Sequence, residues 1–421
     1  MRFVERTRYL IVGAGVSGLS FADWLGDEDY RVLEAEDEIG GYCRTVRKQG
    51  FVWDYAGHFF HFRDPAIEQD LVARMGMERV LRVRRDSRIW YAERLVDFPF
   101  QRNIHQLEEA EYQQCLSDWK ARPEEPVSSF RDMLYARYGK AIAEKFLVPY
   151  NEKLYATDIS TLDVHAMGRF FPHARVEEVL GGQTDGSAED YNRTFTYPEG
   201  GAIQYIRALA SGVRSSLLTT GEPVLQVDLE RRVARTSHRE IGFEHLISTV
   251  PFPSLLRICG LAVPSGVYSA NKVFVLNLGF DGKGLTGVHW VYYPQPEISF
   301  YRVGFYDNIF GSERMSLYVE LGLAADAKVE PGELPALRSR VMADLREVGL
   351  VTHQRLVASH EVLLDPAYVH ISKRSIDGVQ RSKRLLESCG VHSIGRYGSW
   401  TYCSIEDCIV EARALAERLR A

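Results

Sequence analysis

The feature that most constrains this chain is an apolar run followed by three spaced glycines, Tyr9-Leu10-Ile11-Val12-Gly13-Ala14-Gly15-Val16-Ser17-Gly18. The pattern Gly13-x-Gly15-x-x-Gly18 after such a run predicts a strand, a tight turn and a helix. Gly13 would allow the turn, Gly15 would let the backbone approach a pyrophosphate, and Gly18 would let the helix pack closely on the strand. Val16 and Ser17 begin that helix, whose free N–H groups would face the phosphates.

An acidic residue stands where this kind of unit needs one. A second apolar run ends in Val32-Leu33-Glu34-Ala35, about 20 residues after the glycines, where a carboxylate accepts hydrogen bonds from a ribose. Strand, turn, helix, second strand and terminal acid agree with one another. We therefore predict dinucleotide binding at Glu34 and Ala35 rather than a purely structural glycine turn.

Length and charge limit the alternatives. A chain of 421 residues exceeds one ordinary core, so two or more units that share an interface are expected. The net charge of −6 gives no general attraction to nucleic acid or to acidic membranes. We expect neither as a partner, and any anionic ligand must be held by local arginines.

The beginning of the chain and its cysteines point to a cytoplasmic protein. The glycine pattern starts within a dozen residues of Met1, which leaves no room for a signal peptide. No apolar run approaches the roughly 20 residues that span a bilayer. The six cysteines are scattered without a CxxC pair, so reduced thiols are expected.

A second glycine turn selects the cofactor. Gly40, Gly41 and Tyr42 follow closely after Glu34. Nicotinamide enzymes have no particular need for this turn, whereas many flavoproteins place such a pair against the FAD diphosphate, so we predict FAD rather than NAD. A glycine-containing loop, Gly57-His58, lies between aromatic residues and is expected to touch the flavin.

The later pattern predicts an α/β fold in three parts. A Rossmann-like FAD-binding domain would comprise residues 1–95, 211–262 and 391–421, with the run 245–250 as a strand that returns to its sheet. Residues 96–210 would be an inserted helical domain that binds substrate. Residues 263–390 would form an antiparallel β-sheet substrate domain with a helix at 334–348.

The chain ends in a strand, a glycine turn and a helix over 405–420. Gly395 and Arg396 lie in the turn, and Ile405 opens the helix. A helix amino terminus at this place would meet the flavin's pyrimidine edge, which gathers negative charge on reduction.

Four motifs in family order resemble the UDP-galactopyranose mutase family, closer to its eukaryotic branch, within the FAD-dependent amine-oxidase and protoporphyrinogen-oxidase-like superfamily. They are Pro99-Phe100-Gln101, Pro149-Tyr150-Asn151-x-Lys153-x-Tyr155, Phe300-Tyr301-Arg302 and Gly395-Arg396-Tyr397-Gly398-Ser399-Trp400-x-Tyr402. The resemblance covers nearly the whole chain.

The resemblance implies a role for each matching residue. Arg169 and Arg302 would grip the substrate diphosphate, as planar guanidinium forks do well. His58 and Arg396 would lie near the flavin and the sugar. The uridine would be held by Phe100, Gln101, Tyr150, Asn151 and Tyr155, and the diphosphate would receive hydroxyl donors from Tyr292, Tyr368 and Tyr402. Beyond the glycines, the predicted FAD contacts include Val224.

The reaction that the resemblance implies interconverts the pyranose and furanose forms of a UDP-sugar such as UDP-galactose. It runs through an adduct between the sugar and N5 of the reduced flavin, without net redox change. NAD(P)H is a candidate reductant. This chemistry needs orientation and charge stabilisation from the protein, and the sequence offers no metal-ligand cluster and no Ser/His/Asp signature.

Several residues depart from the family pattern and leave the substrate open. Glu406 stands where the eukaryotic family has an asparagine near the sugar. His370 replaces a proline, Ala56 a glycine and Tyr155 a tryptophan. The sugar, the nucleotide, the natural reductant and the oligomeric state therefore stay open.

Two other interpretations share the amino-terminal pattern. One is a flavin oxidase or desaturase of the amine-oxidase or protoporphyrinogen-oxidase type, which would need an apolar cavity and would release peroxide. The other is a flavoprotein that binds without catalysis. The arginines and tyrosines favour the mutase interpretation, because an apolar amine or a porphyrin has no diphosphate to hold.

Overall fold

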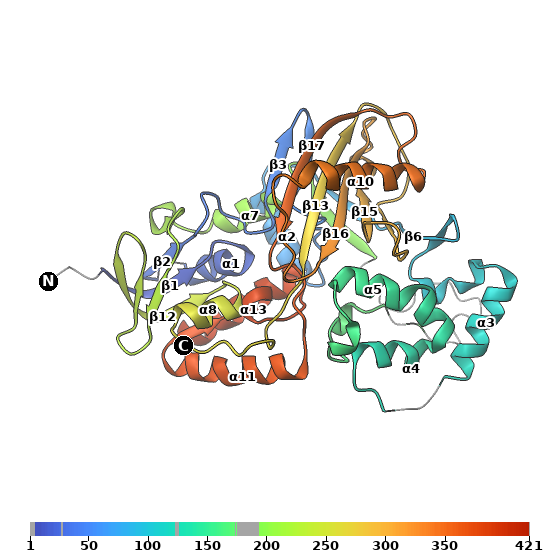
Figure 1. Cartoon of the computed structure of the whole chain (residues 1–421). Helices are drawn as coiled ribbons and strands as arrows, with labels where there is room; N and C mark the ends of the chain where they lie inside the picture. Colours follow the sequence, from blue (N-terminus) through green and yellow to red (C-terminus); the bar gives the residue numbers. More distant parts are fainter. Residues whose placement is uncertain (1–4, 27, 123–125, 173, 175–192, 421) are drawn as a thin grey trace.

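The computed structural model describes residues 5–26, 28–122, 126–172, 174 and 193–420. Within the predicted insertion, residues 123–125, 173 and 175–192 lie outside the described residues. Figure 1 shows one sheet with its helices, which carries both termini, a second sheet beside it, and a helical part next to the second sheet. The predicted α/β fold is confirmed.

The first sheet is the one that the glycine pattern predicts. β1 pairs in parallel with β12 on one side and with β2 on the other, so the predicted return strand is confirmed. Its order is β10-β11-β12-β1-β2-β9, with β18 also paired to β12. The strands are β1 (Glu5–Val12), β2 (Tyr30–Leu33), β9 (Leu218–Thr219), β10 (Gln226–Asp228), β11 (Val233–Arg235), β12 (Glu240–Ser248) and β18 (Val391–Ser393).

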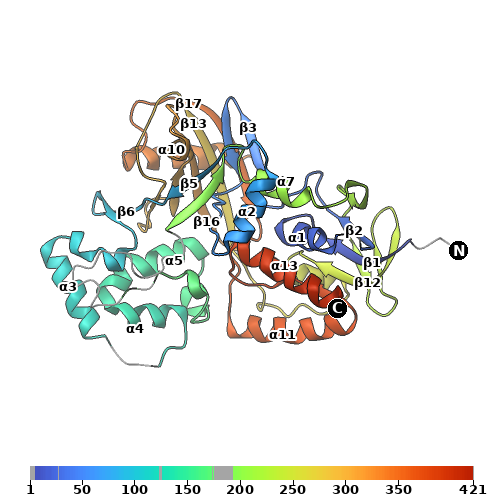
Figure 2. The ribbon, with the colours of Figure 1, turned by 180° about the vertical axis from the view of Figure 1, so that it is seen from behind.

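Helices cover both faces of this sheet, because successive side chains of a strand point to opposite faces. Tyr9 and Ile11 belong to one hydrophobic core, and Leu10 and Val12 to another. The first core receives α1 (Val16–Leu25), α7 (Ile203–Ala210) and α13 (Ile405–Arg420), and the second receives α8 (Phe252–Ile258) and α11 (Lys373–Ser388). Figure 2 shows α13 beside α1 from behind. The predicted carboxy-terminal helix is confirmed.

The second sheet has the order β17-β13-β16-β15-β14-β6-β7. Its pairs are antiparallel apart from β14 with β6, so the predicted antiparallel sheet is confirmed. The strands are β6 (Ser87–Tyr91), β7 (Arg94–Asp97), β13 (Lys272–Phe280), β14 (Trp290–Tyr292), β15 (Arg302–Phe305), β16 (Ser316–Leu323) and β17 (Leu356–Leu364). α10 (Leu334–Glu347), the predicted helix, packs on this sheet through Val341 and Leu345.

The helical part contains α3 (Glu109–Lys120), α4 (Phe130–Ile142), a π-helix (Ala143–Leu147) and α5 (Val148–Tyr155). α4 begins at Phe130, because the Ser129 side chain accepts a hydrogen bond from the N–H of Asp132 and caps the helix. None of the helices in the described part of the chain combines the length and apolar character that crossing a bilayer requires.

Some segments lie elsewhere than the predicted boundaries put them. β6 and β7, assigned to the first domain, extend the second sheet through β14. α7, assigned to the insertion, packs beside α1, and β8 (Thr194–Pro198) pairs with β5 (Val80–Arg84). Local patterns do not reveal these distant partners. The other α-helices and β-strands of the described residues are α2 (Pro65–Arg74), β3 (Thr45–Lys48), β4 (Phe51–Asp54), α9 (Tyr306–Phe310) and α12 (Gly395–Gly398).

Candidate active site

A cavity of about 790 Å³ lies where the three parts meet. The first sheet contributes its glycine turns and residues 395–405. The second sheet contributes Tyr292, Arg302 and Glu320, and the helical part contributes Tyr150 and Asn151. Residues from all three predicted domains thus share one wall, and most of the predicted site residues line it.

The glycine turns form one end of the cavity. Gly13 has φ = 103°, and its N–H donates to the carbonyl of Leu33 at 2.8 Å. A Cβ at Gly18 would lie 1.9 Å from the Gly13 carbonyl oxygen, so only glycine allows this helix to sit so close to the turn. A Cβ at Gly41 would stand 3.7 Å from the Cα of Gly15. The two turns therefore face each other and leave a narrow cradle for a diphosphate.

Glu34 is buried at the end of β2 beside these turns. Its carboxylate accepts hydrogen bonds from the N–H groups of Ala14 at 2.7 Å and Glu36 at 3.0 Å. A buried carboxylate fixed in this way keeps lone pairs for a ribose hydroxyl. The neighbouring prediction is less well supported, because Ala35 is exposed and neither it nor Val224 lines the cavity.

The carboxy-terminal turn closes against the same helix. Gly395 has φ = 81°, and a Cβ there would meet the Ser17 Oγ at 2.3 Å. The N–H of Gly395 donates to Glu411 at 2.7 Å, which ties the turn to α13. Ile405, the first residue of α13, lines the cavity, so the amino terminus of this helix contributes to the wall as predicted.

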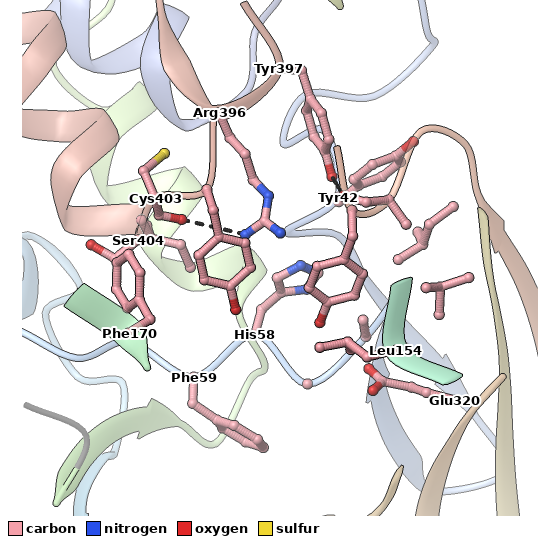
Figure 3. Close-up of a pocket in the computed structure, with 18 of the residues that line it drawn as sticks. Tyr42, His58, Phe59, Leu154, Phe170, Glu320, Arg396, Tyr397, Cys403 and Ser404 are labelled. Atoms are coloured by element: carbon pink, nitrogen blue, oxygen red, sulfur yellow. Dashed lines mark hydrogen bonds between the residues drawn. The ribbon is translucent and has the colours of Figure 1, made fainter. Parts of the chain in front are cut away.

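His58 and Arg396 point toward each other inside the cavity (Figure 3). Burial, together with the nearby charges of Arg396 and Arg302, lowers the pKa of His58 to about 4. The imidazole is therefore neutral at physiological pH, and its Nδ1 has no hydrogen-bond partner among the described residues. Gly57 allows the loop to pass close to Tyr318, since a Cβ there would lie 2.7 Å from that ring.

Two tyrosines flank the guanidinium of Arg396. Tyr368 and Tyr402 stack with their ring centres 5.9 Å apart, and the Arg396 Cζ lies 5.3 Å and 4.6 Å from these centres. A third tyrosine, Tyr292, accepts a hydrogen bond from the Trp290 indole at 2.7 Å. All three line the cavity, as the predicted donors to a diphosphate should.

Arg302 has a carboxylate partner that the sequence analysis missed. Its Nε and one Nη donate to Glu320 at 2.5 Å and 2.8 Å. Glu320 is buried, and its charge helps to keep the pKa of Arg302 well above the ordinary value despite the desolvation of the guanidinium. Arg302 is thus held rigidly, and its remaining N–H groups are the ones left for a ligand.

Arg169 is also paired. One Nη donates to both oxygens of Asp407 at 2.5 Å and 2.6 Å. Burial alone would raise the pKa of Asp407, but hydrogen bonds from Arg169 and Ser404 hold it below the ordinary value. Arg169 and Arg302 line the same cavity, so the structure brings the two predicted arginines together.

Glu406 does not line the cavity, which corrects its assignment to the sugar site. Its buried carboxylate accepts hydrogen bonds from the backbone N–H groups of Arg63 and Asp64, each at 2.8 Å, just before the start of α2. The next residue, Asp407, does not line the cavity either, but its carboxylate pairs with Arg169, which does. Successive residues of an α-helix are about 100° apart around the helix axis, so Glu406 and Asp407 point in different directions.

Three of the predicted uridine contacts also lie behind the wall rather than on it. Phe100 is fully buried and stacks on Phe146 at 5.3 Å, and Tyr155 is fully buried as well. Gln101 donates to the Pro172 carbonyl, while its Oε1 has no partner among the described residues. These side chains face the core of the helical part. The residues on the cavity side include Phe98, Arg102, Phe146, Tyr150 and Asn151.

The departures from the family pattern have structural partners. The His370 ring bonds to Ser269 and to the Tyr155 carbonyl, both at 2.9 Å, and so supports the end of α5. Ala56 lines the cavity, and its carbonyl accepts the His58 N–H at 2.7 Å. Neither arrangement reveals which sugar or base would bind.

One missed residue had a signal in the sequence. Ser404-Ile405-Glu406-Asp407 is a capping pattern, and the Ser404 N–H donates to Asp407 at 2.8 Å while the Asp407 N–H donates to the Ser404 Oγ at 3.1 Å. The pattern fixes the start of α13 and thereby turns Asp407 toward Arg169. Glu320 and Phe146 had no comparable local signal. No group of metal ligands was found among the described residues.

The facing glycine turns, the buried Glu34 and the helix amino terminus define a dinucleotide-binding protein whose residues fit FAD. Several solved structures share this fold. The reduced form of UDP-galactopyranose mutase matches with a TM-score of 0.89 at 23% identity, covering 98% of this chain and 94% of that one. A protein from Exiguobacterium sp. 255-15 described as a protoporphyrinogen oxidase matches with 0.76 at 18%, covering 99% of each chain. Cyclohexylamine oxidase from Brevibacterium oxydans IH-35A matches with 0.67 at 14%, covering 99% and 100%.

Residues 16–419 match the family described as flavin containing amine oxidoreductase, and this chain belongs to that family. At these identities the solved structures establish the fold alone. The predicted superfamily is therefore confirmed, while nothing in these comparisons supports the predicted proximity to the eukaryotic branch.

Proposed function

We propose that this protein is a flavin-dependent nucleotide-sugar mutase that interconverts the pyranose and furanose forms of a UDP-sugar, with UDP-galactose as the first candidate. Bound reduced flavin would supply the nucleophile for the sugar carbon that carries the diphosphate, and NAD(P)H would be a candidate reductant. The chain's own residues would bind and orient the sugar nucleotide and stabilise its charge.

The observation that carries this proposal is the environment of Arg396. In the part of the chain that the structure describes, its buried Nε has no hydrogen-bond partner, and one Nη donates only to the Cys403 carbonyl at 3.4 Å. Among the described residues it forms no ion pair. A guanidinium without a carboxylate, on a cavity wall beside Tyr368 and Tyr402, favours an anionic ligand.

The diphosphate would lie between Arg302 and Arg169, with Tyr292, Tyr368 and Tyr402 as neutral donors. Glu320 and Asp407 already use part of each guanidinium. A guanidinium has five N–H donors, so a phosphate oxygen can use the groups of Arg302 that Glu320 leaves. The two acids would then keep the arginines in place before the substrate arrives.

The base would lie against the helical part. Tyr150 and Phe146 stack at 5.2 Å with their planes 9° apart, and both line the cavity. Asn151 donates to the Leu147 carbonyl at 2.7 Å, while its buried Oδ1 has no partner among the described residues. An unsatisfied amide oxygen beside aromatic rings is suited to a ring N–H of a pyrimidine.

His58 would act as a neutral group beside the reacting carbon. A protonated imidazole would add a third positive charge next to Arg396 and Arg302, and its low pKa prevents that. The neutral ring can accept or donate a hydrogen bond to a sugar hydroxyl through Nδ1 without competing for the diphosphate.

A second candidate is an oxidase or desaturase that acts on an apolar substrate. The closed Arg302–Glu320 pair and the aromatic lining, which includes Phe59, Phe98 and Trp290, favour it, because a paired guanidinium attracts an anion less strongly. For this candidate, flavin bound against the glycine turns would supply a hydride acceptor for the substrate, with oxygen as the final electron acceptor and peroxide as the by-product.

The deciding experiment compares the two activities in one preparation. Dithionite-reduced protein is incubated with a panel of UDP- and dTDP-sugars, and the products are separated by chromatography. The oxidised protein is given amines in air and assayed for peroxide. A furanose isomer without peroxide supports the mutase. Peroxide formation with no isomer from any sugar nucleotide would support the oxidase.

A further inference from the structure

Two cysteines that are apart in the sequence meet on the cavity wall. The Sγ atoms of Cys403 and Cys408 are 3.6 Å apart, and both residues line the cavity. Cys403 precedes α13, and Cys408 lies in its first turn. They are five positions apart and do not form a CxxC pattern, so the sequence did not predict that they meet.

We propose that Cys403 and Cys408 form a redox pair that closes to a disulfide and exchanges an electron pair with the flavin bound in this cavity. The proposal rests on flavin binding alone and not on the identity of the substrate. It also gives the proposed mutase a way to keep or regain the reduced flavin that it needs.

The geometry allows the bond to form. A disulfide has an S–S distance of about 2.05 Å, so the two sulfurs must approach by about 1.5 Å. The amino terminus of α13 favours a thiolate near its free N–H groups. The two thiols share a hydrogen bond in which either sulfur can be the donor, and this contact lowers the pKa of Cys408.

The pair also touches the residues that would hold the flavin. Cys408 contacts the Ser17 side chain, and Ser17 packs against Gly395 in the carboxy-terminal turn. The Cys403 carbonyl accepts the hydrogen bond from Arg396 that Figure 3 marks. The thiols therefore lie between the first glycine turn and Arg396, on the wall assigned to the cofactor.

The exchange is balanced as a two-electron step. Two S–H bonds are lost, one S–S bond forms, and the electron pair passes to oxidised flavin. One of the two protons goes to the reduced ring and the other to solvent. A small dithiol such as dithiothreitol restores the two thiols by exchange and becomes a cyclic disulfide itself.

The test counts thiols and electrons in the flavin-loaded protein. The protein is treated with diamide, freed of reagent, unfolded and titrated with Ellman's reagent, and its peptides are mapped. We expect two of the six thiols to disappear and the mapped disulfide to join Cys403 to Cys408. The oxidised holoprotein is then titrated anaerobically with dithionite while flavin absorbance is followed. Wild type should take up twice as many electrons per flavin as Cys408→Ser.

A matched control separates this pair from the other cysteines. Cys389 is partly exposed and lies near Cys259, so Cys389→Ser should behave as wild type in both titrations. The proposal is overturned if all six thiols react after diamide, if the disulfide maps to Cys259 and Cys389, or if wild type and Cys408→Ser take up equal numbers of electrons. Because no sugar is used, failure of the mutase proposal would not affect this result.

Discussion

Arg302 and Glu320 are directly opposite each other on β15 and β16, where they form a largely buried ion pair with two hydrogen bonds of 2.5 Å and 2.8 Å. The strand register sets this contact before any ligand binds. A phosphate that enters the cavity therefore meets a guanidinium whose orientation is fixed and whose charge is partly balanced. The pair sets both the stability of the empty cavity and its affinity for anions.

Replacing the carboxylate should separate these two effects. Glu320→Gln leaves the largely buried guanidinium of Arg302 without an opposite charge, and we expect the free energy of unfolding to fall by about 3 kcal/mol. UDP should bind several-fold more tightly to the variant and restore part of the lost stability, because its phosphates replace the missing charge. Thermal unfolding with and without UDP measures both effects. Glu361→Gln, in the more exposed Arg338–Glu361 pair, is the control. Unchanged stability of Glu320→Gln would contradict this account.

Two phenylalanines near the predicted base site should behave differently. Phe100 is fully buried, so Phe100→Ala should lower the free energy of unfolding by about 3–5 kcal/mol. Phe98 lines the cavity and contacts Tyr292 at 4.9 Å, so Phe98→Ala should mainly weaken UDP binding, by roughly tenfold. Urea unfolding and UDP titration of each variant test this. If Phe100→Ala weakens UDP binding at full stability, the base contacts the residue that the sequence predicted.

Glu34 should decide how much flavin the protein retains. Glu34→Ala removes the buried carboxylate at the end of β2 and leaves the N–H of Ala14 without its partner. We expect the purified variant to carry less than about a tenth of the wild-type flavin, in line with a loss of 1.5–3 kcal/mol for a charge-assisted hydrogen bond. The ratio of flavin to protein absorbance measures this. Glu36→Ala changes an exposed neighbour and should retain the cofactor; equal loss in both variants would remove the special role of Glu34.

His58 should make stability depend on pH. Its pKa is about 4 in the folded protein and about 6.5 when unfolded, so the unfolded state binds a proton first as the pH falls. The imidazole is neutral in both states above about pH 6.5, and the folded state loses stability progressively from there down to about pH 4. Between these two pH values we expect the free energy of unfolding of His58→Gln to fall by about 2 kcal/mol less than that of wild type. Water in the cavity makes this difference smaller than the pKa shift alone would give. Urea unfolding at neutral and acidic pH measures it, with exposed His353→Gln as the control. Parallel pH profiles for wild type and His58→Gln would show that His58 is not the group.

The sequence predicted those parts of the fold that depend on local pattern. The turn at Gly13, Gly15 and Gly18 could be predicted because its steric requirements involve residues that are close together in the sequence. The pairing of β1 with β12 could be predicted from an apolar run of the right length. The periodicity of α13 gave its bounds because both of its ends carry local signals.

Contacts between distant strands could not be obtained in this way. Glu320 meets Arg302 only because β15 and β16 pair in one register. Phe100 and Phe98 differ by two residues, and packing against Phe146 rather than composition decides which one is buried. Cys403 and Cys408 meet because a helix begins between them. In each case the contact depends on where the fold places the residue and not on the sequence around it.

The central claim is that flavin and a sugar diphosphate share one cavity, with Arg302 on the diphosphate. The most direct measurement is a UDP titration of the flavin-loaded protein followed by the difference spectrum of the flavin. We predict a saturable change in wild type and in Arg340→Ala, whose arginine forms a more exposed pair with Asp344, and a loss of binding of at least about tenfold in Arg302→Ala with flavin retained. A flavin spectrum that UDP leaves unchanged in wild type, or equal UDP affinity in Arg302→Ala, would contradict the claim.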